Sequence, residues 1–202
     1  MRRWFVPMML AVTLSGYDQS HIDRLFREEG CQGCDFSGAD LSGRDLSAFE
    51  MQHSDFRGAD LKKSNLFMAE LQGCDFTGAD LESAIFWKAD LTSGNFTGVN
   101  AKGANFKGAK FRKATIRNSD FRESVAWKAD FSEALVEKSD FGNSELGGAE
   151  FSRNDLTSVN LQGAILWKTH FRDAVLTQQQ CDEATREEAV FDENVTCRQR
   201  TF

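Results

Sequence analysis

Cysteines are the residues of this chain whose type and spacing most directly suggest chemistry. Cys31 and Cys34 form a Cys-x-x-Cys pair, Cys181 and Cys197 lie sixteen positions apart, and Cys74 is left over. A Cys-x-x-Cys pair can close a local disulfide, act as a redox pair or supply half of a metal site. The two pairs lie toward opposite ends of the sequence. We therefore expect disulfides that fasten the two ends of one domain.

Metal and redox catalysis find little support in the residues around Cys31 and Cys34. Zinc needs further ligands nearby, and His21 is the only candidate. A thioredoxin-like redox pair needs a βαβ setting, which the flanking sequence does not offer. The other histidines, His53 and His170, are isolated, and the chain has no Gly-rich phosphate loop, H-E-x-x-H or nucleophile elbow. We expect no enzymatic activity, no cofactor and no metal.

A large apolar residue returns at every fifth position through most of the chain. The series runs from Phe36 to Leu176 in 29 units without a skipped step, and only Ala101 and Ala126 are weak. A small residue often lies two positions before each centre, and Asp, Asn or Glu usually lies directly before it. A period of five fits neither an α-helix nor a strand. Units this short cannot bury an apolar side alone and must stack on their neighbours.

These units resemble the pentapeptide-repeat family, whose consensus is A-(D/N)-L-x-x. The runs that match best are ADLSG, ADLKK, ADLES, ADLTS, ANFKG and ADFSE, and the resemblance covers residues 34–176. It implies an all-β fold, a right-handed quadrilateral β-helix with one pentapeptide per side, about twenty residues per coil and about seven coils, closed by short helical caps. Leu, Phe and small residues then fill the axis and leave no room for a substrate, which is the main argument against an enzyme.

Three residues depart from the pattern because they occupy slots that should be small. They are Arg44, Phe49 and Asn154, and we interpret each as a bulge or a locally swollen coil. The repeat also places Cys34 and Cys74 in one inward column, two coils or roughly 9.6 Å apart. That separation exceeds the reach of a disulfide, so we expect Cys74 to be a buried free thiol.

The repeat divides the chain into four segments. Residues 1–16 have a basic start, a short apolar run and then small polar residues, as in a secretory signal peptide. Residues 17–30 are predicted to form an N-terminal capping helix that starts near Ser20 and ends at Gly30. Residues 31–176 form the pentapeptide-repeat β-helix. Residues 177–202 form a C-terminal cap because the five-residue register fails there, and the helical stretch is expected over 182–191.

One outward column of the predicted β-helix carries tryptophan and lysine. The tripeptides FWK, AWK and LWK recur every forty residues, which is once per two coils. Two interpretations remain: a ladder of stacked side chains that stabilises one side, or a docking surface. The first is favoured. Lys107 would lie between Trp87 and Trp127 and contact both rings. The candidate binding stripe consists of Phe67, Trp87, Lys88, Lys107, Trp127, Lys128, Trp167 and Lys168.

A basic belt crosses the middle of the repeat, where no Asp or Glu occurs from Thr92 to Ser119. Its members wrap around more than one side of the coil, so solvated surface is the favoured interpretation and an anion-binding site is the alternative. Besides Lys107, the belt contains Lys102, Lys110, Arg112, Lys113 and Arg117.

The sequence favours a non-enzymatic, exported protein that acts as a structural scaffold or protein-binding module through an outer face. The partner would be a protein or an envelope component, in the periplasm of a bacterium or another extracytoplasmic space. The net charge of −7 disfavours both nucleic acid and an anionic membrane as general partners. No stable membrane anchor is expected, and an end cap is a candidate homodimer contact. The alternative, implied by the family resemblance, is a cytoplasmic acidic protein that mimics DNA and inhibits or protects a type II topoisomerase (gyrase).

Overall fold

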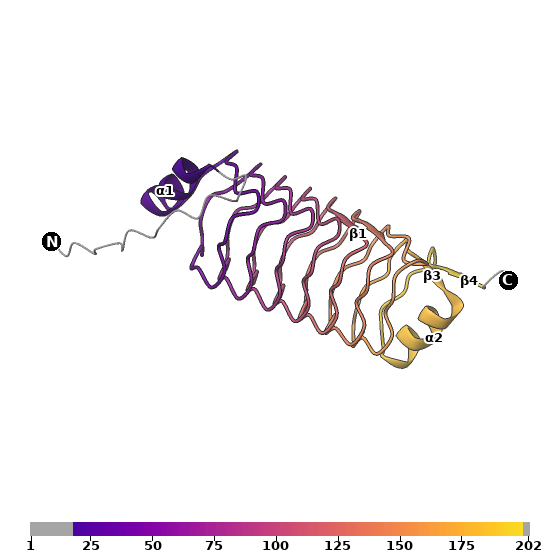
Figure 1. Ribbon diagram of the computed structural model, residues 1–202. Helices are drawn as coiled ribbons and strands as arrows, with labels where there is room; N and C mark the ends of the chain where they lie inside the picture. Colours follow the sequence, from indigo (N-terminus) through magenta and orange to yellow (C-terminus); the bar gives the residue numbers. More distant parts are fainter. Residues whose placement is uncertain (1–17, 200–202) are drawn as a thin grey trace.

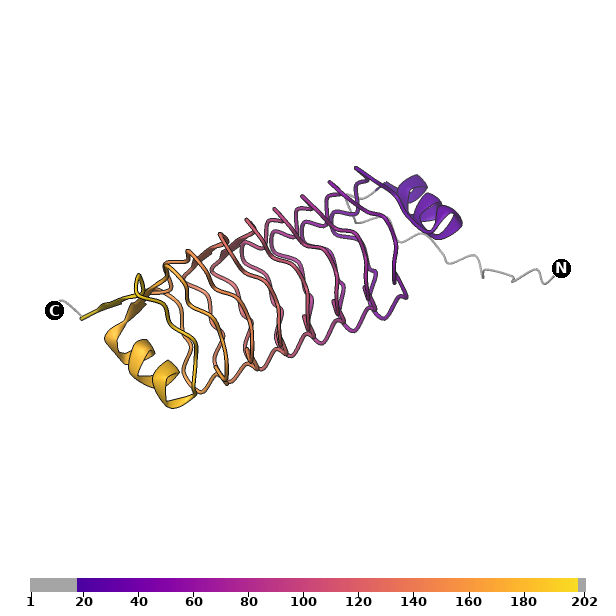
Figure 2. The same ribbon diagram turned by 180° about the vertical axis from the view of Figure 1, so that it is seen from behind.

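The backbone of the repeat winds so that residues twenty positions apart lie side by side. Parallel bridges join Asp35 to Asp55, Asp55 to Asp75 and Asp75 to Asn95, and the same spacing recurs through the rest of the repeat. The successive turns stack into a rod, with a helix near each end (Figures 1 and 2). The structure is a computed structural model that describes residues 18–199. Segment 1–16, predicted to be a signal peptide, lies outside the described residues.

Regular secondary structure is short because each side of a coil holds only five residues. Most contacts between coils are therefore single bridges rather than strands. A corner with positive φ follows nearly every buried centre by two residues, as at Gly78 (68°) and Lys88 (59°). The named elements are α1 (Gln19–Glu28), β1 (Thr115–Arg117), β2 (Leu135–Glu137), β3 (Val175–Thr177), α2 (Gln178–Arg186) and β4 (Thr196–Arg198). Strand β1 pairs in parallel with β2, and β3 pairs in parallel with β4.

The centres of the five-residue units form the core of the rod. Phe76, Leu81, Phe86 and Leu91 are from four successive sides and are all fully buried. This confirms the predicted inward orientation. Phenylalanines of one side stack in a column. The ring centroids of Phe111 and Phe131 are 4.8 Å apart, and those of Phe131 and Phe151 are 4.7 Å apart. Stacking of this kind stabilises beyond the area that the rings bury.

At the N-terminal end, the two oversized residues Arg44 and Phe49 do not distort the backbone. The bridges from Asp45 and Glu50 to the next coil are intact, so the predicted bulge is wrong for this pair. The first coil has no coil beneath it, and both side chains use that space to reach helix α1. Phe49 packs edge-on against Phe26 at 6.5 Å, and the Arg44 guanidinium lies 5.8 Å from the same ring.

Asn154 behaves as predicted, because the ladder of bridges is interrupted beside it. Its buried side-chain Nδ2 donates to the carbonyl of Ala134 at 2.5 Å. In a regular coil, that carbonyl accepts from the backbone N–H of residue 155. No bridge joins Leu135 to Asp155 within the described part of the chain. The coil is therefore locally distorted at this position.

Helix α1 is capped by residues other than those predicted. Asp18 is the N-cap, and its carboxylate accepts from the backbone N–H of Ser20 at 2.8 Å. The helix ends at Glu29, which adopts the left-handed conformation with φ 53°. Gly30 is needed for a different reason: a Cβ there would lie 2.7 Å from the carbonyl oxygen of Glu50 in the next coil. The predicted roles of Ser20 and Gly30 as the start and end signals are therefore wrong.

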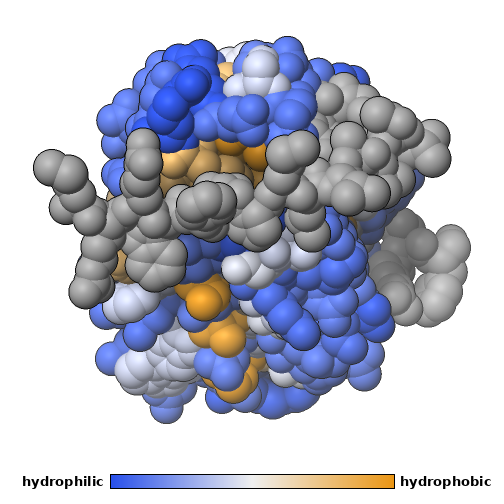
Figure 3. Space-filling view, turned by 60° about the vertical axis from the view of Figure 1, so that its left-hand side comes forward, coloured by the Kyte–Doolittle hydropathy of each residue, from blue (hydrophilic) through white to orange (hydrophobic). Residues whose placement is uncertain are grey.

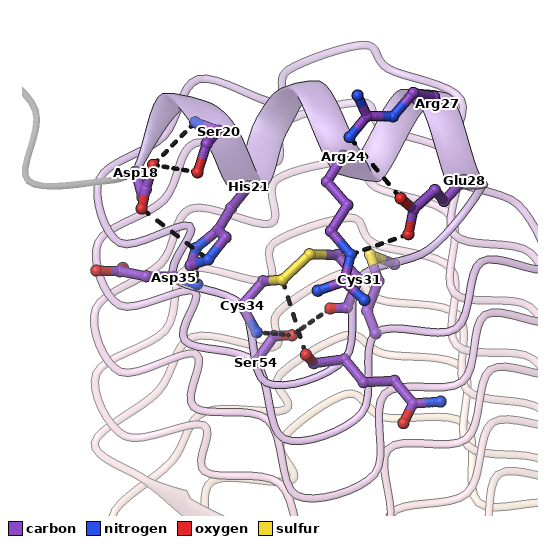
Figure 4. The surroundings of a disulfide bond; sticks show 12 residues. Asp18, Ser20, His21, Arg24, Arg27, Glu28, Cys31, Cys34, Asp35 and Ser54 are labelled. Atoms are coloured by element: carbon purple, nitrogen blue, oxygen red, sulfur yellow. Dashed lines mark hydrogen bonds and ion pairs between the residues drawn. A yellow bond between two sulfur atoms is a disulfide. The ribbon is translucent and has the colours of Figure 1, made fainter.

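His21 attaches helix α1 to the first coil (Figure 4). In later coils, the residue before each buried centre donates its backbone N–H to a carbonyl of the preceding coil. Asp55, for example, donates to the carbonyl of Cys34 at 2.8 Å. Asp35 has no coil below it, and its N–H donates to His21 Nδ1 at 2.9 Å. The imidazole thus takes the place of the missing carbonyl.

Helix α2 begins earlier than predicted and is followed by a return of the repeat. Thr177 and Gln180 form a capping box that starts the helix, so helical structure covers 178–186 rather than 182–191. Val190 then bridges to His170, twenty residues before it, and Phe191 stacks on Phe171 at 5.8 Å. The prediction that the register ends after Leu176 is therefore incomplete, because α2 replaces part of a coil and the ladder resumes beyond it.

Both predicted cysteine pairs are bonded in the structure. Cys31 and Cys34 are joined under helix α1, with their Cα atoms 5.7 Å apart (Figure 4). Cys181 and Cys197 join α2 to β4 across a Cα distance of 6.1 Å. Cys74 is a buried free thiol, as predicted, and its Sγ donates to the carbonyl of Met51.

Candidate functional site

The outer side of the coil above the buried centres Phe86, Phe106 and Ala126 carries the tryptophans and lysines. Parallel bridges join Ile85 to Asn105 and continue along the same side to Val125, Glu145 and Ile165. The residues that follow each centre are therefore neighbours along the rod. We call this surface the Trp–Lys face, which comprises Phe67, Met68, Ile85, Trp87, Lys88, Lys107, Val125, Trp127, Lys128, Ile165, Trp167 and Lys168.

The aromatic rings of the Trp–Lys face form two separate pairs. Phe67 and Trp87 have ring centroids 5.0 Å apart, and Trp127 and Trp167 have centroids 6.1 Å apart. The second pair spans two coils because Gly147 lies between its members. A Cβ at Gly147 would be 2.5 Å from a ring carbon of Trp127. The bare backbone of Gly147 thus makes room for the Trp127 ring.

Two of the three lysines that follow a tryptophan contact its ring, and no such contact joins Lys128 to Trp127 in residues 18–199. Lys88 Nζ lies 5.4 Å from the centroid of Trp87, and Lys168 Nζ lies 4.3 Å from that of Trp167. Lys107 makes no cation–π contact within the part of the chain described. Lys107 lies in the coil between those of Trp87 and Trp127, as predicted, but the predicted contact with both rings is wrong. Adjacent coils are about 4.8 Å apart, and the contacts between coils on this face are made by the ring pairs Phe67–Trp87 and Trp127–Trp167.

An aliphatic residue accompanies each tryptophan, which the sequence analysis missed. Ile85, Val125 and Ile165 each lie two positions before a tryptophan and recur every forty residues. Ile85 and Ile165 are large exposed hydrophobic residues, as are Trp87 and Trp167, which are 40 % and 41 % exposed. The full motif is therefore aliphatic-x-Trp-Lys, and a comparison of the three forty-residue units would have found it.

Trp127 is the least accessible of the three tryptophans on this face. Its ring is half-buried over Gly147, and its Nε1 donates to Glu145 Oε2 at 2.7 Å. That hydrogen bond also occupies the carboxylate of Glu145, which lies in the same column as Ile85 and Ile165. Trp127 is thus held in place by the protein itself.

The lysines of the Trp–Lys face are free of ion pairs. None of Lys88, Lys107, Lys128 and Lys168 lies within 4.0 Å of a carboxylate in residues 18–199. The face therefore combines apolar side chains with four lysines that carry no ion pair, and the carboxylate of Glu145 in the same column accepts from Trp127.

The basic belt differs from the Trp–Lys face because its other cations are paired. Each of the five lies near a carboxylate of an adjacent coil, and the acidic residues missing from its own segment are supplied there. The ion pairs are Lys102–Glu123 at 3.2 Å, Lys110–Asp90 at 3.0 Å, Arg112–Asp130 at 3.7 Å, Lys113–Glu133 at 4.0 Å and Arg117–Glu137 at 2.9 Å. These pairs favour solvated surface over an anion-binding site.

Acidic residues on the other sides of the rod are held in local turns. The Asp40 carboxylate accepts from the hydroxyl of Ser42 at 2.6 Å and from its backbone N–H at 3.0 Å. These hydrogen bonds stabilise the ionised form and lower the pKa of Asp40. Seen from the N-terminal end, most of the surface is hydrophilic, and hydrophobic residues reach it only in narrow areas (Figure 3).

Two hollows in the surface are not lined by residues of the Trp–Lys face, although the second reaches Ala48, whose backbone N–H donates to the carbonyl of Phe67. One is lined by Arg112, Ser132, Ser152 and Arg153, among others, and a second lies beneath helix α1 beside Cys31. No group of three or more His, Cys, Asp or Glu side chains in residues 18–199 is arranged to hold a metal ion. Neither helix of the described chain has the length and apolar character needed to cross a bilayer.

Comparison with known proteins identifies repeats over most of the chain. A family model described as a pentapeptide repeat region matches residues 31–106, and a second, described as pentapeptide repeats (8 copies), matches 95–125, 129–167 and 155–178. A search of curated proteins found no match.

Solved structures of pentapeptide repeat proteins are similar to this chain at low identity. HetL, involved in heterocyst differentiation regulation in the cyanobacterium Nostoc sp. strain PCC 7120, is 20 % identical with a TM-score of 0.39, and the match covers 89 % of this chain and 92 % of HetL. Trypsin-treated QnrB1, a plasmid-mediated fluoroquinolone resistance protein, is 23 % identical with a TM-score of 0.38, covering 81 % and 92 %. A protein from the Arabidopsis thaliana thylakoid lumen is 23 % identical with a TM-score of 0.24, covering 75 % and 77 %.

Proposed function

The chain belongs to the pentapeptide-repeat family, and from that premise we propose that it is a non-enzymatic binding module. Proteins of this family are generally structural or binding proteins rather than enzymes. In this chain, the Trp–Lys face would hold a protein or an envelope component, and the rest of the rod would serve as a rigid scaffold. The fold we infer is a right-handed quadrilateral β-helix of about seven coils with helical caps, which the bridges between residues twenty apart support.

The observation that carries the proposal is the combination of exposed apolar rings and unpaired lysines on one side of a filled rod. The centres of the coils are buried side chains, so binding has to use the exterior. Contiguous exposed apolar residues are uncommon on a monomer without a partner. Aromatic residues are also enriched where proteins bind one another.

Export of the protein is part of the proposal. The basic start and apolar run of segment 1–16 favour a secretory signal. The two disulfides are of the kind that persists in an oxidising compartment. We therefore propose a periplasmic or other extracytoplasmic location, with a cytoplasmic location as the alternative. Mass spectrometry of the mature N-terminus, combined with cell fractionation, tests this directly.

A cytoplasmic DNA mimic that acts on a type II topoisomerase is the second candidate function. The net charge of −7 and the rows of Asp along the rod favour it. The unpaired lysines of the Trp–Lys face oppose it, because a DNA mimic needs a negative surface. Inhibition or protection of purified gyrase by the purified chain would favour this candidate over the first.

The proposed binding face can be tested by affinity capture with matched variants. We expect the double variant Trp87→Ala/Trp167→Ala to lose the partners that the wild-type protein retains, because both rings are exposed and neither is needed for the core. Leu135→Ala is the control, because Leu135 is similarly exposed (41 %) and lies on another side. Identical capture by the wild-type protein and the double variant would argue that the Trp–Lys face is not the binding surface.

A further inference from the structure

We propose that the partner of the Trp–Lys face is the surface of an anionic lipid bilayer, on which the rod lies with this side down. The inference rests on the proposed function, since it assigns a partner to the same face. It concerns reversible docking on the membrane surface, in keeping with the absence of a bilayer-crossing helix from the described residues.

The shape of the face fits a planar partner better than a projecting one. Its side chains stand in rows along neighbouring coils, which are joined by the bridges from Ile85 through Asn105 and Val125 to Ile165. The hollows beside Arg112 and beneath helix α1 are lined by other residues than those of the Trp–Lys face. A bilayer surface needs no hollow on the protein, because the exposed rings of Trp87 and Trp167 can themselves enter the membrane interface.

The side-chain types of the face match the chemistry of the membrane interface. Tryptophan is enriched there because its ring is apolar while its N–H remains hydrated. Nε1 of Trp127 is satisfied by Glu145, but Nε1 of Trp87 and Trp167 makes no hydrogen bond within residues 18–199. Ile85 and Ile165 expose aliphatic surface beside those two rings. The units of Trp87 and Trp167 thus each present an apolar contact and a free polar N–H together.

The charge of the face selects an anionic surface. Lys88, Lys107, Lys128 and Lys168 carry no ion pair in the described chain, and long lysine side chains can reach headgroups while their stems cover apolar surface. A net charge of −7 opposes binding to an anionic surface when the charge is assigned to the molecule as a whole. Salt screens charges beyond about 8 Å, so the acidic residues on the opposite sides act weakly on a membrane that touches this side.

Neutral carbohydrate is a poorer match for the same face. A sugar stacks on the flat surface of an aromatic ring, but Lys88 and Lys168 already lie over Trp87 and Trp167. The rings are also tilted within their pairs, at 48° and 54°. They therefore offer no continuous flat platform.

Flotation of the purified full-length chain with lipid vesicles tests the proposal. We expect binding to vesicles of phosphatidylglycerol and phosphatidylcholine, little binding to vesicles of phosphatidylcholine alone, and release at high salt. Lys88→Gln/Lys168→Gln should lower the affinity about thirtyfold, as expected for removing two lysines near an anionic surface. Lys113→Gln/Lys138→Gln is the matched control, because both lysines lie on other sides, Lys138 is unpaired in the described chain and Lys113 is 4.0 Å from its partner Glu133; it should bind nearly as the wild-type protein does.

Three results would overturn the proposal. One is a failure of the wild-type chain to bind anionic vesicles, and another is equal binding to neutral vesicles. The third is equal loss of binding in the two lysine double variants, or no loss in either, which would assign binding to total charge or to segment 1–16. If vesicles do not bind but partner capture still depends on Trp87 and Trp167, the proposed function stands and the lipid assignment falls. Thermal unfolding of each variant verifies that it is folded.

Discussion

Trp127 differs at the residue scale from the other two tryptophans of the Trp–Lys face. Its ring lies over the backbone of Gly147 and is tied to Glu145, whereas Trp87 and Trp167 are exposed. Residue 147 is a glycine because the Trp127 ring lies close to its backbone. The Cβ of any other residue would lie within 2.7 Å of that ring. Trp127 therefore supports the face, and the two exposed rings are the ones available to a partner.

We predict that Gly147→Ala displaces the Trp127 ring and lowers the free energy of unfolding by about 1–3 kcal/mol, as overpacking does. Loss of the contact between Trp127 and Trp167 should change the tryptophan fluorescence and the near-ultraviolet circular dichroism. The same substitution in a Trp127→Ala background should be nearly neutral, because the clashing ring is gone. A full additional loss of stability in that background would contradict this explanation.

The buried thiol of Cys74 makes the free energy of unfolding depend on pH in the alkaline range. Burial raises the pKa of Cys74 from 9.0 to about 12. Between these values the unfolded chain loses the thiol proton while the folded chain keeps it, so the folded state binds more protons. We predict that the free energy of unfolding falls as the pH rises above about 9, by at most ~1.4 kcal/mol per pH unit from this group.

Urea unfolding at about pH 8 and about pH 10.5 measures this dependence. Cys74→Ala is the control, since alanine occupies the equivalent slot in many other units, including Ala79. The wild-type protein should lose more stability than the variant between the two pH values. Equal losses would mean that the thiol does not contribute.

At the scale of the element, one five-residue side shows why its composition repeats. The acidic or amide residue before each centre accepts from the backbone N–H two residues later, as Asp75 does from Thr77 at 2.9 Å. This local turn explains the preference for Asp and Asn there. The centre is buried and the corner follows it with positive φ. Each side is thus defined by its own residues, which is why the repeat could be predicted from the sequence.

The contacts at the ends of the rod could not be predicted in the same way. They depend on which backbone N–H and C=O groups have no neighbouring coil to pair with. His21 suggested only a metal ligand in the sequence, yet it accepts from the N–H of Asp35. Arg44 and Phe49 violated the pattern because Phe26 lies beside them. The orientation of the tryptophan rings likewise depends on the space at Gly147. These are contacts between segments, and a five-residue period carries no signal for them.

Gln180 closes the C-terminal end of the ladder. Its Nε2 donates to the carbonyls of Val159 and Leu156 at 2.8 and 2.9 Å. In a regular coil, the residue twenty-one positions after Val159, which is Gln180, would donate to that carbonyl through its backbone N–H. The side chain therefore replaces a backbone hydrogen bond that helix α2 has withdrawn, and it does so in a buried position.

We predict that Gln180→Ala lowers the free energy of unfolding by about 1–3 kcal/mol, because it leaves the carbonyl of Val159 without a donor. The carbonyl of Leu156 keeps the backbone N–H of Val159 as a donor. Gln179→Ala is the control on the same helix. Gln179 is exposed and bonds only Glu183, so its loss should cost less than about 0.5 kcal/mol. Hydrogen exchange should show faster opening of β3 and β4 in the first variant. Equal effects of the two substitutions would refute the capping role.

At the scale of the whole molecule, the position of a residue on the rod depends on the number of units that precede it. Four units return the chain to the same side, so Trp87, Trp127 and Trp167 share a face because forty is a multiple of twenty. Stability in stacked repeats is a sum over neighbouring units. Removing whole units should therefore shorten the rod without abolishing the fold, while the number removed decides which residues stay aligned.

We predict different outcomes for two internal deletions. Deletion of residues 101–120 removes one coil, leaves Asn100 followed by Phe121, and keeps Trp87 on the same side as Trp127 and Trp167. Deletion of 101–105 removes one side and moves every later residue to the adjacent side of the rod. Both variants should remain folded, as judged by circular dichroism and by cooperative thermal unfolding, because every inward slot is still filled by an apolar centre.

The two deletions should differ in binding. The five-residue deletion should have the larger effect, although it removes fewer residues. The twenty-residue deletion keeps one continuous aromatic face and should retain partner or vesicle binding, somewhat weakened by the loss of Lys107. The five-residue deletion divides the tryptophans between two sides and should lose binding, since the rings can no longer meet one surface together. Retained binding by a folded five-residue deletion, or loss of binding by a folded twenty-residue deletion, would mean that alignment along one side of the rod is not what the partner recognises.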